Sequence, residues 1–525
     1  MDDRSQFSRD RQLDHLTSES GVWDLVVIGG GATGVGIAID AATRNYRVAL
    51  VEQYDFGKGT SSRSTKLAHG GVRYLEQGNV SLVREALHER GRMIRNAPHL
   101  VHPLPTIVPL HSHWERFYYG VGLKVYDLLS GRLRLGPSRY LTLSETTAEI
   151  PTLQTHGIVG GIRYYDGAFD DARLLINMMQ TAIEAGATCV NYVRARELMK
   201  ESGRVVGVVA EDGETGREIR LRAKVVVNAT GPFSDHVRRM DEPQAPAAIV
   251  PSQGIHLVFD RAFMPGDSAL IVPKTRDGRV IFAIPWHEHT MVGTTDTELK
   301  DAPVDPRPLP EEISFLLETI APYWTRKPQA SDIRAIFAGI RPLARSDDSK
   351  TSSKLARDHV IRVSSSGLVS IMGGKWTTYR RMAEDGVDRA AAVGGLLPTP
   401  CRTKTLPIHG GQGELTSGAL AQYGSDGPAI AGLAASQPGL DQPLADRLPH
   451  TAAQVVWAAR HEMARSVEDV LARRVRALFY DAEAAIAAAP LVASLLAEEL
   501  GRDAKWQADQ LAAFHSIAEL YRYHR

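Results

Sequence analysis

Apolar residues recur along the chain in two patterns, as short continuous runs and as runs with helical spacing. The continuous runs at 25–28, 48–51 and 225–227 predict strands buried on both faces, because such strands need no alternating polar positions. Apolar positions three and four residues apart predict amphipathic helices at 82–94 and 171–185. This alternation of strands and helices indicates an α/β fold.

The first apolar run leads into a glycine turn with the spacing G-x-G-x-x-G. Gly29 permits the tight turn, Gly31 lets a ligand approach the backbone, and Gly34 allows the next helix to pack closely on the strand. The N-terminus of that helix presents N–H groups and a positive dipole end, which suit a pyrophosphate. Glu52 ends the next strand, 18 residues after Gly34, where a carboxylate can accept hydrogen bonds from ribose hydroxyls. The unit at 24–53 therefore predicts a dinucleotide site, with FAD and NAD as alternatives.

Later segments predict a second sheet and a helical C-terminal part. Three strands suggest a sheet on the substrate side of the molecule, at 256–259, 280–285 and 291–295. Glycines and prolines indicate a boundary near residue 398. Residues 451–479 have helical spacing, and further helices follow that are interrupted by Pro490 and Gly501. Within this part, Ser466-x-x-Asp469 resembles a capping box, and no redox or acid–base cluster is visible there.

Composition narrows the class of protein. The chain of 525 residues is long enough for two or three domains, and its 61 basic and 61 acidic residues give no overall attraction to nucleic acid. Cys189 and Cys401 are too few for a disulfide scaffold and have no metal-ligand spacing, so no metal site is expected. Because the charges balance, no nucleic-acid partner is expected either. Residues 1–20 are polar with mixed charge and are expected to form a disordered tail.

Several longer motifs carry a family resemblance. They are TSSRSTKLAHGGVRYLE at 60–76, DDAR at 170–173, VVNATGP at 226–232, IPWHEHTMVGTTD at 284–296, GIRPL at 339–343 and GGKWTTYR at 373–380. With these motifs the chain, from about residue 22 to 480, resembles the FAD-dependent, aerobic-type glycerol-3-phosphate dehydrogenases. The resemblance implies bound FAD and oxidation of sn-glycerol-3-phosphate to dihydroxyacetone phosphate.

The same resemblance implies a division into domains. It predicts a Rossmann-like FAD-binding domain of the D-amino-acid-oxidase type at 21–398, mainly 21–95, 171–250 and 331–398. An antiparallel-sheet substrate domain would be interleaved with it, at about 96–170 and 251–330. A helical C-terminal domain at 399–525 would complete the chain, which then has a mixed α/β fold.

Oxidation of an alcohol beside a phosphate needs a base for the hydroxyl proton and cations for the phosphate. By resemblance, the substrate-binding residues are Arg73, Tyr74, Arg341 and Lys375. Lys375 also follows two glycines, where its charge can stabilise an anion formed in the reaction. His69 and His256 are equal candidates for the base, since imidazole titrates near neutral pH. The expected cofactor-binding residues are Gly29, Gly31, Gly34, Glu52, Ser62, Lys66, Gly231, Gly373, Gly374 and Thr377.

The segment 111–140 bears on location. Its aromatic and basic residues suit a lipid headgroup interface, or a helix packed on the substrate sheet with a solvated basic face. The resemblance implies a cytoplasmic protein attached peripherally to the inner face of the cell membrane, with a quinone as electron acceptor. Two other functions stay open, an oxidase that uses oxygen and a non-catalytic, membrane-associated flavoprotein scaffold. A homodimer is also among the partners that the sequence leaves open.

Overall fold

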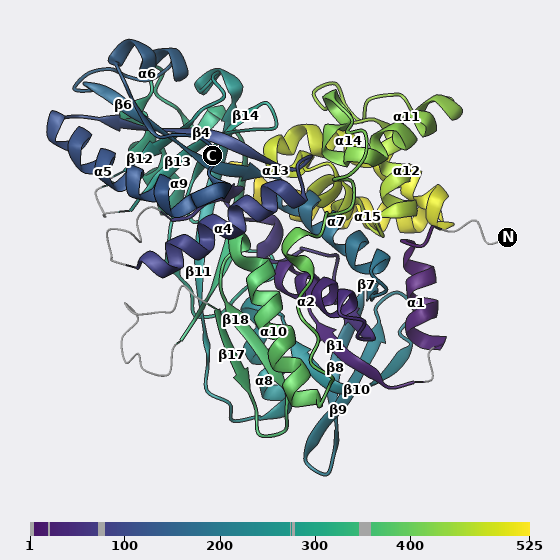
Figure 1. Ribbon diagram of the computed structural model, residues 1–525. Coiled ribbons are helices and arrows are strands. Elements are labelled where there is room, and N and C mark those ends of the chain that lie inside the picture. The colour runs from purple at the N-terminus through teal and green to yellow at the C-terminus, as the bar shows by residue number, and fades with distance from the viewer. Residues whose placement is uncertain are drawn as a thin grey trace.

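The computed structural model describes residues 5–18, 21–71, 79–273, 275, 279–345 and 359–524. In this part of the chain two large sheets lie next to each other, and helices of the C-terminal part cover one end of both (Figure 1). The first sheet has eight strands and the second has ten. The predicted fold class is confirmed: an α/β dinucleotide domain, a mainly antiparallel second sheet and a helical C-terminal domain.

The first sheet is built around the predicted buried strands. Its parallel core consists of β7 (Thr188–Val190), β2 (Val48–Val51), β1 (Trp23–Ile28), β10 (Glu218–Asn228) and β18 (Val369–Gly373). Antiparallel strands complete it, namely β17 (His359–Val363), β8 (Val193–Glu201) and β9 (Arg204–Asp212). Leu25 and Val27 pack against helices, while Val26 and Ile28 pack against β8 and β9, so both faces of β1 are buried.

Three helices cover one face of the first sheet. They are α2 (Ala32–Thr43), α7 (Asp171–Glu184) and α10 (Tyr379–Gly394), and their apolar residues form one core with Leu25 and Val27. On the other face, β8 and β9 and the short helix α8 (Ser234–Asp241) enclose a second core. The carboxyl ends of β1 and β2 are thus left free of covering strands, as in other doubly wound sheets.

The second sheet carries the predicted substrate-side strands. Its order is β15 (Thr297–Glu298), β11 (Ile249–Asp260), β14 (His289–Gly293), β13 (Ile281–Trp286), β12 (Ala269–Val272), β4 (Val101–Leu110), β6 (Gly160–Phe169) and β3 (Leu67–Ala68). In addition, β16 (Ile333–Ala344) pairs with β11 and β5 (Arg139–Leu141) pairs with β6. Four helices flank it, α4 (Val80–Asn96), α5 (His113–Ser130), α6 (Leu143–Glu149) and α9 (Pro310–Ile320).

Two expected domain limits need correction. Residues 67–68 were expected in the FAD-binding part, but β3 pairs with β6 of the second sheet. Residues 331–344 were expected in the FAD-binding part, but β16 pairs with β11 over almost its whole length and lies in the second sheet. The physical reason is that an apolar strand pattern shows that a strand is buried but does not show which strand it pairs with. The FAD-type sheet is therefore rejoined only at β17 and β18.

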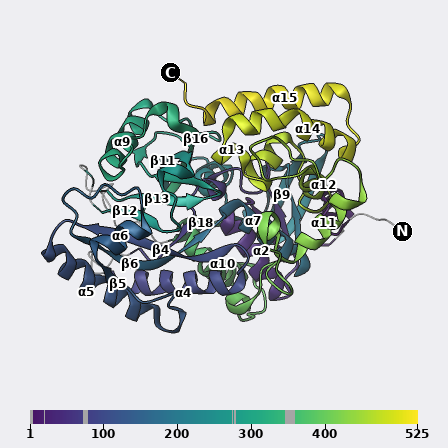
Figure 2. The same ribbon diagram turned by 90° about the horizontal axis from the view of Figure 1, so that it is seen from above.

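The helical domain consists of α11 (Gly427–Ser436), α12 (Ala452–His461), a π-helical turn (Asp469–Arg474), α13 (Ala477–Tyr480), α14 (Ala482–Leu500) and α15 (Ala504–Ala518). Seen from above, α14 and α15 lie side by side at its outer edge (Figure 2). The capping pair is confirmed, because the backbone N–H groups of Ser466 and Asp469 bond to each other's side chains at 3.1 Å. Gly501 ends α14 as expected, with φ 61°. Pro490 does not interrupt it, since the buried face continues across the proline to Val492.

The expectation of a disordered tail at 1–20 is wrong for residues 9–18, which form the helix α1 (Arg9–Ser18). Arg9 is 3 % exposed and forms a buried ion pair with Asp212. Gln12 accepts a hydrogen bond of 3.1 Å from the backbone of Cys189 at the edge of the first sheet. Polar partners far away in the sequence hold this helix, so its polar composition gave no sign of it.

A charged histidine links the first sheet domain to the helical domain. The imidazole of His409 lies between Glu184 of α7, at 2.7 Å, and Asp426, at 2.9 Å. Burial lowers the pKa of His409, but the hydrogen bonds and charges of Asp426 and Glu184 outweigh this and raise the pKa to about 9. The link is therefore strongest when the imidazole is protonated.

We expect this link to make stability depend on pH. The folded pKa of His409 lies above its ordinary value of 6.5, so its contribution is complete below pH 6.5 and is lost as the pH rises through about 9. The melting temperature, measured from pH 6 to 10, should fall in this window by more in the wild type than in His409→Gln. Equal pH profiles for the two proteins would contradict this role.

Candidate functional site

A cavity opens where the strands of the first sheet end. Turns that follow β1, β2, β10 and β18 line it, together with the start of β8; they comprise 28–33 without Gly30, 51–54, 57–61, 193–195, 229–233 and 373–376. Ligands of doubly wound sheets bind outside the carboxyl ends of the strands, at the place where this cavity lies. The predicted dinucleotide unit therefore forms one wall of a real cavity.

The glycine turn has the geometry that a pyrophosphate requires. Gly29 has φ 113°, and a Cβ atom on Gly34 would lie 1.9 Å from the carbonyl oxygen of Gly29. Gly31 is the N-cap of α2, provides no side-chain cap and lines the cavity. The N–H of Ala32 donates to the hydroxyl of Ser61, at 3.0 Å, and the helix N-terminus faces the cavity where an anion would bind.

Glu52 lines the same cavity at the end of β2. Its carboxylate accepts hydrogen bonds from the backbone N–H groups of Gly30, at 2.7 Å, and Tyr54, at 2.9 Å. Burial raises the pKa of Glu52, and these two bonds oppose the rise. A carboxylate has about four acceptor positions, so Glu52 retains capacity for the hydroxyls of a ribose.

The opposite wall contains three of the other expected glycines. Gly231, Gly373 and Gly374 line the cavity, with φ values of 55°, 74° and 80°. These left-handed conformations favour glycine, and a Cβ atom on Gly374 would lie 2.4 Å from the sulfur of Met382. The two walls are joined where Trp376 donates a hydrogen bond of 2.9 Å to the carbonyl of Ser61.

The segment 60–71 connects this cavity to the second sheet. Thr60 donates a hydrogen bond of 2.7 Å to the carbonyl of Ile340 in β16, and the hydroxyl of Thr65 lies 3.0 Å from Nε2 of His256 in β11. At its end the backbone N–H of His69 donates to the hydroxyl of Thr377, at 3.2 Å. His69 therefore lies in this segment, and His256 of β11 lies beside it.

The two histidines have different neighbours and both have lowered pKa values. Burial is the largest cause of the low pKa of His69, with further lowering by the cations Lys375 and Arg90. Burial also lowers the pKa of His256 well below its ordinary value, together with Lys66 and Arg341. A neutral imidazole can accept a proton, so the geometry leaves both as candidate bases.

Arg341 lies on β16 close to His256. Its guanidinium donates to the carbonyl of Thr295 and to the hydroxyl of Thr294, both at 3.0 Å, while Asp296 lies 3.5 Å away. The side chain is 35 % exposed. These contacts orient the planar fork, and a partly exposed guanidinium suits recognition of a phosphate.

Lys375 lines the cavity directly after Gly373 and Gly374. It is close enough to His69 to lower the pKa of that imidazole. The structure thus places Lys375 near His69, and Arg341 near His256 on the second sheet; of these four residues, only Lys375 lines the cavity. Arg73 and Tyr74 lie outside the described residues.

Four expected cofactor residues do not line the cavity, namely Gly34, Ser62, Lys66 and Thr377. For Lys66 the structure corrects the prediction: its ammonium is 1 % exposed and bonds to Asp171, at 2.7 Å, and to the carbonyl of Ser62, at 2.9 Å. Burial lowers the pKa of Lys66 to about 8. Lys66 is a core ion pair because Asp171, distant in the sequence, supplies its counter-charge.

Sequence reasoning missed several residues that line the cavity. They include Tyr54, Lys58, Arg194, Phe233 and His236. The available signal was position, since each follows the carboxyl end of a strand or begins the next element. Residue type alone did not distinguish them from surface residues.

The glycine turn, the open helix end and Glu52 fit the pyrophosphate and ribose of FAD, and comparison with known proteins identifies the class. The family model described as "FAD dependent oxidoreductase" matches residues 24–380. The model described as "C-terminal domain of alpha-glycerophosphate oxidase" matches residues 401–507. The fold and the cavity are thus those of an FAD-dependent oxidoreductase.

More similar relatives narrow this class. The chain is 40 % identical to a mitochondrial glycerol-3-phosphate dehydrogenase of Arabidopsis thaliana, over 95 % of this chain and 86 % of the relative. The human mitochondrial glycerol-3-phosphate dehydrogenase is 39 % identical, over 96 % of this chain and 74 % of the relative. A solved glycerol-3-phosphate dehydrogenase from Bacillus halodurans, complexed with FAD, has a TM-score of 0.80 at 30 % identity, with 98 % of each chain covered. The chain belongs to the family of FAD-dependent glycerol-3-phosphate dehydrogenases.

Proposed function

We propose that this protein oxidises sn-glycerol-3-phosphate to dihydroxyacetone phosphate and passes the electrons to a membrane quinone. The observation that carries the proposal is that each of two cations lies near a histidine of lowered pKa: Lys375, which lines the cavity, near His69, and Arg341, on the adjoining second sheet, near His256. Bound FAD supplies the acceptor for the hydride. The names and the high coverage of the relatives support the same substrate.

Side chains of the protein bind the phosphate, stabilise negative charge and remove the hydroxyl proton. Arg341 offers a paired, charge-assisted contact to the substrate phosphate, held in place by Thr294 and Thr295. Lys375 at the cavity stabilises negative charge as the substrate hydroxyl loses its proton. His69 or His256 takes that proton as a neutral base, while the hydrogen on carbon leaves as hydride. The proton and the two electrons of the alcohol are thereby accounted for.

The electron acceptor is the finer part of the proposal. The relatives at 39 % and 40 % identity are named dehydrogenases, which favours a quinone over oxygen. Oxygen is the second candidate, because residues 401–507 match the C-terminal domain of an oxidase. Stoichiometric formation of peroxide during turnover in air would assign the protein to that second candidate.

The helix α5 supports a peripheral position on a membrane. Its exposed apolar residues follow one another at helical spacing and therefore share one face: Trp114, Phe117, Tyr118, Val121, Val125 and Leu128. Trp114 is 68 % exposed and Leu128 is 79 % exposed. The alternative that these aromatic residues pack on the substrate sheet does not hold for Trp114, Phe117 and Tyr118, whereas Tyr126 is buried.

Charge and position also suit α5 to a lipid surface. Arg132 and Arg134 are exposed directly after this helix, where they can approach anionic headgroups. Both ribbon views show α5 at the far side of the molecule from the helices α11 and α12 (Figures 1 and 2). Among the described residues, no helix is both long enough and apolar enough to cross a membrane. We propose peripheral attachment through α5 to the cytoplasmic face; self-association stays a prediction.

The phosphate contact can be tested by substitution. Arg341→Ala should raise KM for glycerol-3-phosphate strongly, since loss of a charge-assisted contact in a partly buried site costs about 2–5 kcal/mol. Arg341→Lys should recover only part, because an ammonium cannot make the paired contacts. Arg334→Ala is the matched control, a charge at the other end of the same strand that pairs weakly with Asp260 at 3.7 Å. An unchanged KM in Arg341→Ala would refute the phosphate assignment.

Vesicle binding tests the role of α5. The wild type should sediment with anionic phospholipid vesicles, less so at high salt because exposed charges are screened. Leu128→Ser should sediment clearly less, while Leu397→Ser, which changes a leucine that is 81 % exposed outside α5, should bind like the wild type. Equal binding of the two variants would contradict an α5 membrane surface.

A further inference from the structure

Three buried arginines of the helical domain point into the FAD-binding domain. Arg473 is 2 % exposed, and Arg474 and Arg476 are 0 % exposed. Arg473 and Arg474 end the π-helical turn. Arg476, two residues later, has a left-handed backbone with φ 67°. Such a conformation is costly for a residue other than glycine and persists only where the surroundings require it. The local backbone is therefore shaped to aim these side chains.

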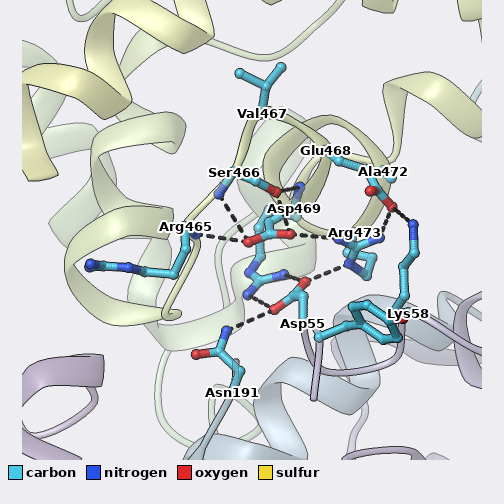
Figure 3. Close-up of polar contacts among 12 residues, drawn as sticks. Asp55, Lys58, Asn191, Arg465, Ser466, Val467, Glu468, Asp469, Ala472 and Arg473 are labelled. Atoms are coloured by element: carbon cyan, nitrogen blue, oxygen red, sulfur yellow. Dashed lines mark hydrogen bonds and ion pairs between the residues drawn. The ribbon is translucent and has the colours of Figure 1, made fainter. Parts of the chain in front are cut away.

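The first two arginines bind Asp55, which follows the cavity-lining residues 51–54 in the chain. Figure 3 shows the contact between Arg473 and Asp55. Arg474 makes a paired contact with both carboxylate oxygens, at 2.7 and 2.9 Å, and Nε of Arg473 binds the same carboxylate. Burial raises the pKa of Asp55, but the two arginines outweigh burial and hold it below its ordinary value. Asn191 adds a hydrogen bond of 3.2 Å. Asp55 is thus fixed as an anion from three directions.

A second contact holds Lys58, which itself lines the cavity. Its ammonium lies 2.6 Å from Glu468 of the helical domain and 2.9 Å from Asp305 of the substrate domain. Arg473 binds the same carboxylate of Glu468, at 2.7 Å (Figure 3). Burial raises the pKa of Glu468, while Arg473 and Lys58 lower it to about 2. All three domains therefore meet at Lys58.

The third arginine, Arg476, binds the chain at Ser62, directly after the cavity-lining residues 57–61. Arg476 donates hydrogen bonds of 2.9 Å to the carbonyl of Ser62 and to Asp171. Lys66 binds these same two groups from the other side. The carbonyl of Ser62 is thereby bound by two cations, and both cations are also bound by Asp171.

These anchored points enclose the part of the wall that lines the cavity, residues 57–61. Two glycines give this stretch its path: Gly57 is buried against Leu175 with φ 77°, whereas a Cβ atom on Gly59 would meet nothing within 4 Å. Its inner end contacts the cofactor turn, where the N–H of Gly57 donates to the carbonyl of Gly30 at 3.1 Å. A displacement of Asp55 or Lys58 would therefore be transmitted to the glycine turn and to Glu52.

We propose that Arg473, Arg474 and Arg476 are positioning residues for FAD, so that the C-terminal domain completes the cofactor site from behind. The proposal rests on FAD binding, which the family and the cavity establish. Buried ion pairs contribute little net stability compared with well-packed apolar residues, so domain docking alone does not require this network. What the network adds is a single fixed geometry for residues 55–62.

The test compares affinity for FAD with overall stability. Two variants loosen this part of the chain. Glu468→Gln keeps the volume and removes one of the two carboxylates that hold Lys58, and Arg474→Lys keeps the charge but loses the paired contact with Asp55. The control is His409→Gln, because His409 pairs with Glu184 across the same domain interface, at 2.7 Å, and touches neither residues 55–62 nor the three arginines in the described structure. Apoprotein is titrated with FAD, and the flavin absorption spectrum and the melting temperature are recorded.

We expect Glu468→Gln and Arg474→Lys to weaken FAD binding about tenfold or more, about 1.4 kcal/mol or more, and to shift the flavin absorption bands. His409→Gln should lower the melting temperature and leave FAD affinity and spectrum unchanged. The proposal fails if the first two variants lower only the melting temperature. It also fails if His409→Gln weakens FAD binding equally, since domain docking in general would then explain the effect. Should Arg474→Lys not fold, Glu468→Gln, at the partly exposed edge of the network, decides alone.

Discussion

The close contact between α2 and β1 is the constraint on which the rest of the structure depends. Any side chain at Gly34 would lie 1.9 Å or less from the carbonyl oxygen of Gly29, so this helix can approach the strand only with glycine there. Because the helix is held so close, its N-terminus and Glu52 of the neighbouring strand face one cavity. The position of the cofactor, and with it the direction from which a substrate must approach, follows from that contact.

One segment of the chain positions the second sheet relative to the glycine turn at 29–34. Residues 60–71 leave the cavity and bond in succession to Ile340, His256 and Thr377. The two sheets are built from alternating stretches of sequence. These bonds hold them in fixed positions relative to each other near the candidate catalytic histidines. The helical domain supports the beginning of the same segment through its buried arginines. One stretch of chain thus links cofactor, substrate and C-terminal domain.

The sequence alone predicted those parts that local patterns encode. The strands β1 and β2, the glycine turn and Glu52 lie where expected, since their spacing is short and each residue type has one conformational role. The errors concern partners that are distant in the sequence. Lys66 was expected at the cofactor, yet its ammonium is bound to Asp171 in the core.

Two further errors have the same origin. The helix α1 was expected to be disordered, but Arg9 is buried by Asp212, which lies 203 residues later in the chain. The strand β16 was expected in the first sheet, although it pairs with β11 in the second. Burial of a charged residue depends on its counter-charge, and pairing of a strand depends on its neighbour. Neither can be inferred from spacing in a single sequence.

The central claim is that one site binds FAD and oxidises glycerol-3-phosphate beside it. Anaerobic titration of the purified, flavin-containing protein with glycerol-3-phosphate tests it most directly. Each equivalent of substrate should bleach one equivalent of flavin absorption and yield dihydroxyacetone phosphate. A flavin that stays fully oxidised in excess glycerol-3-phosphate would contradict the account.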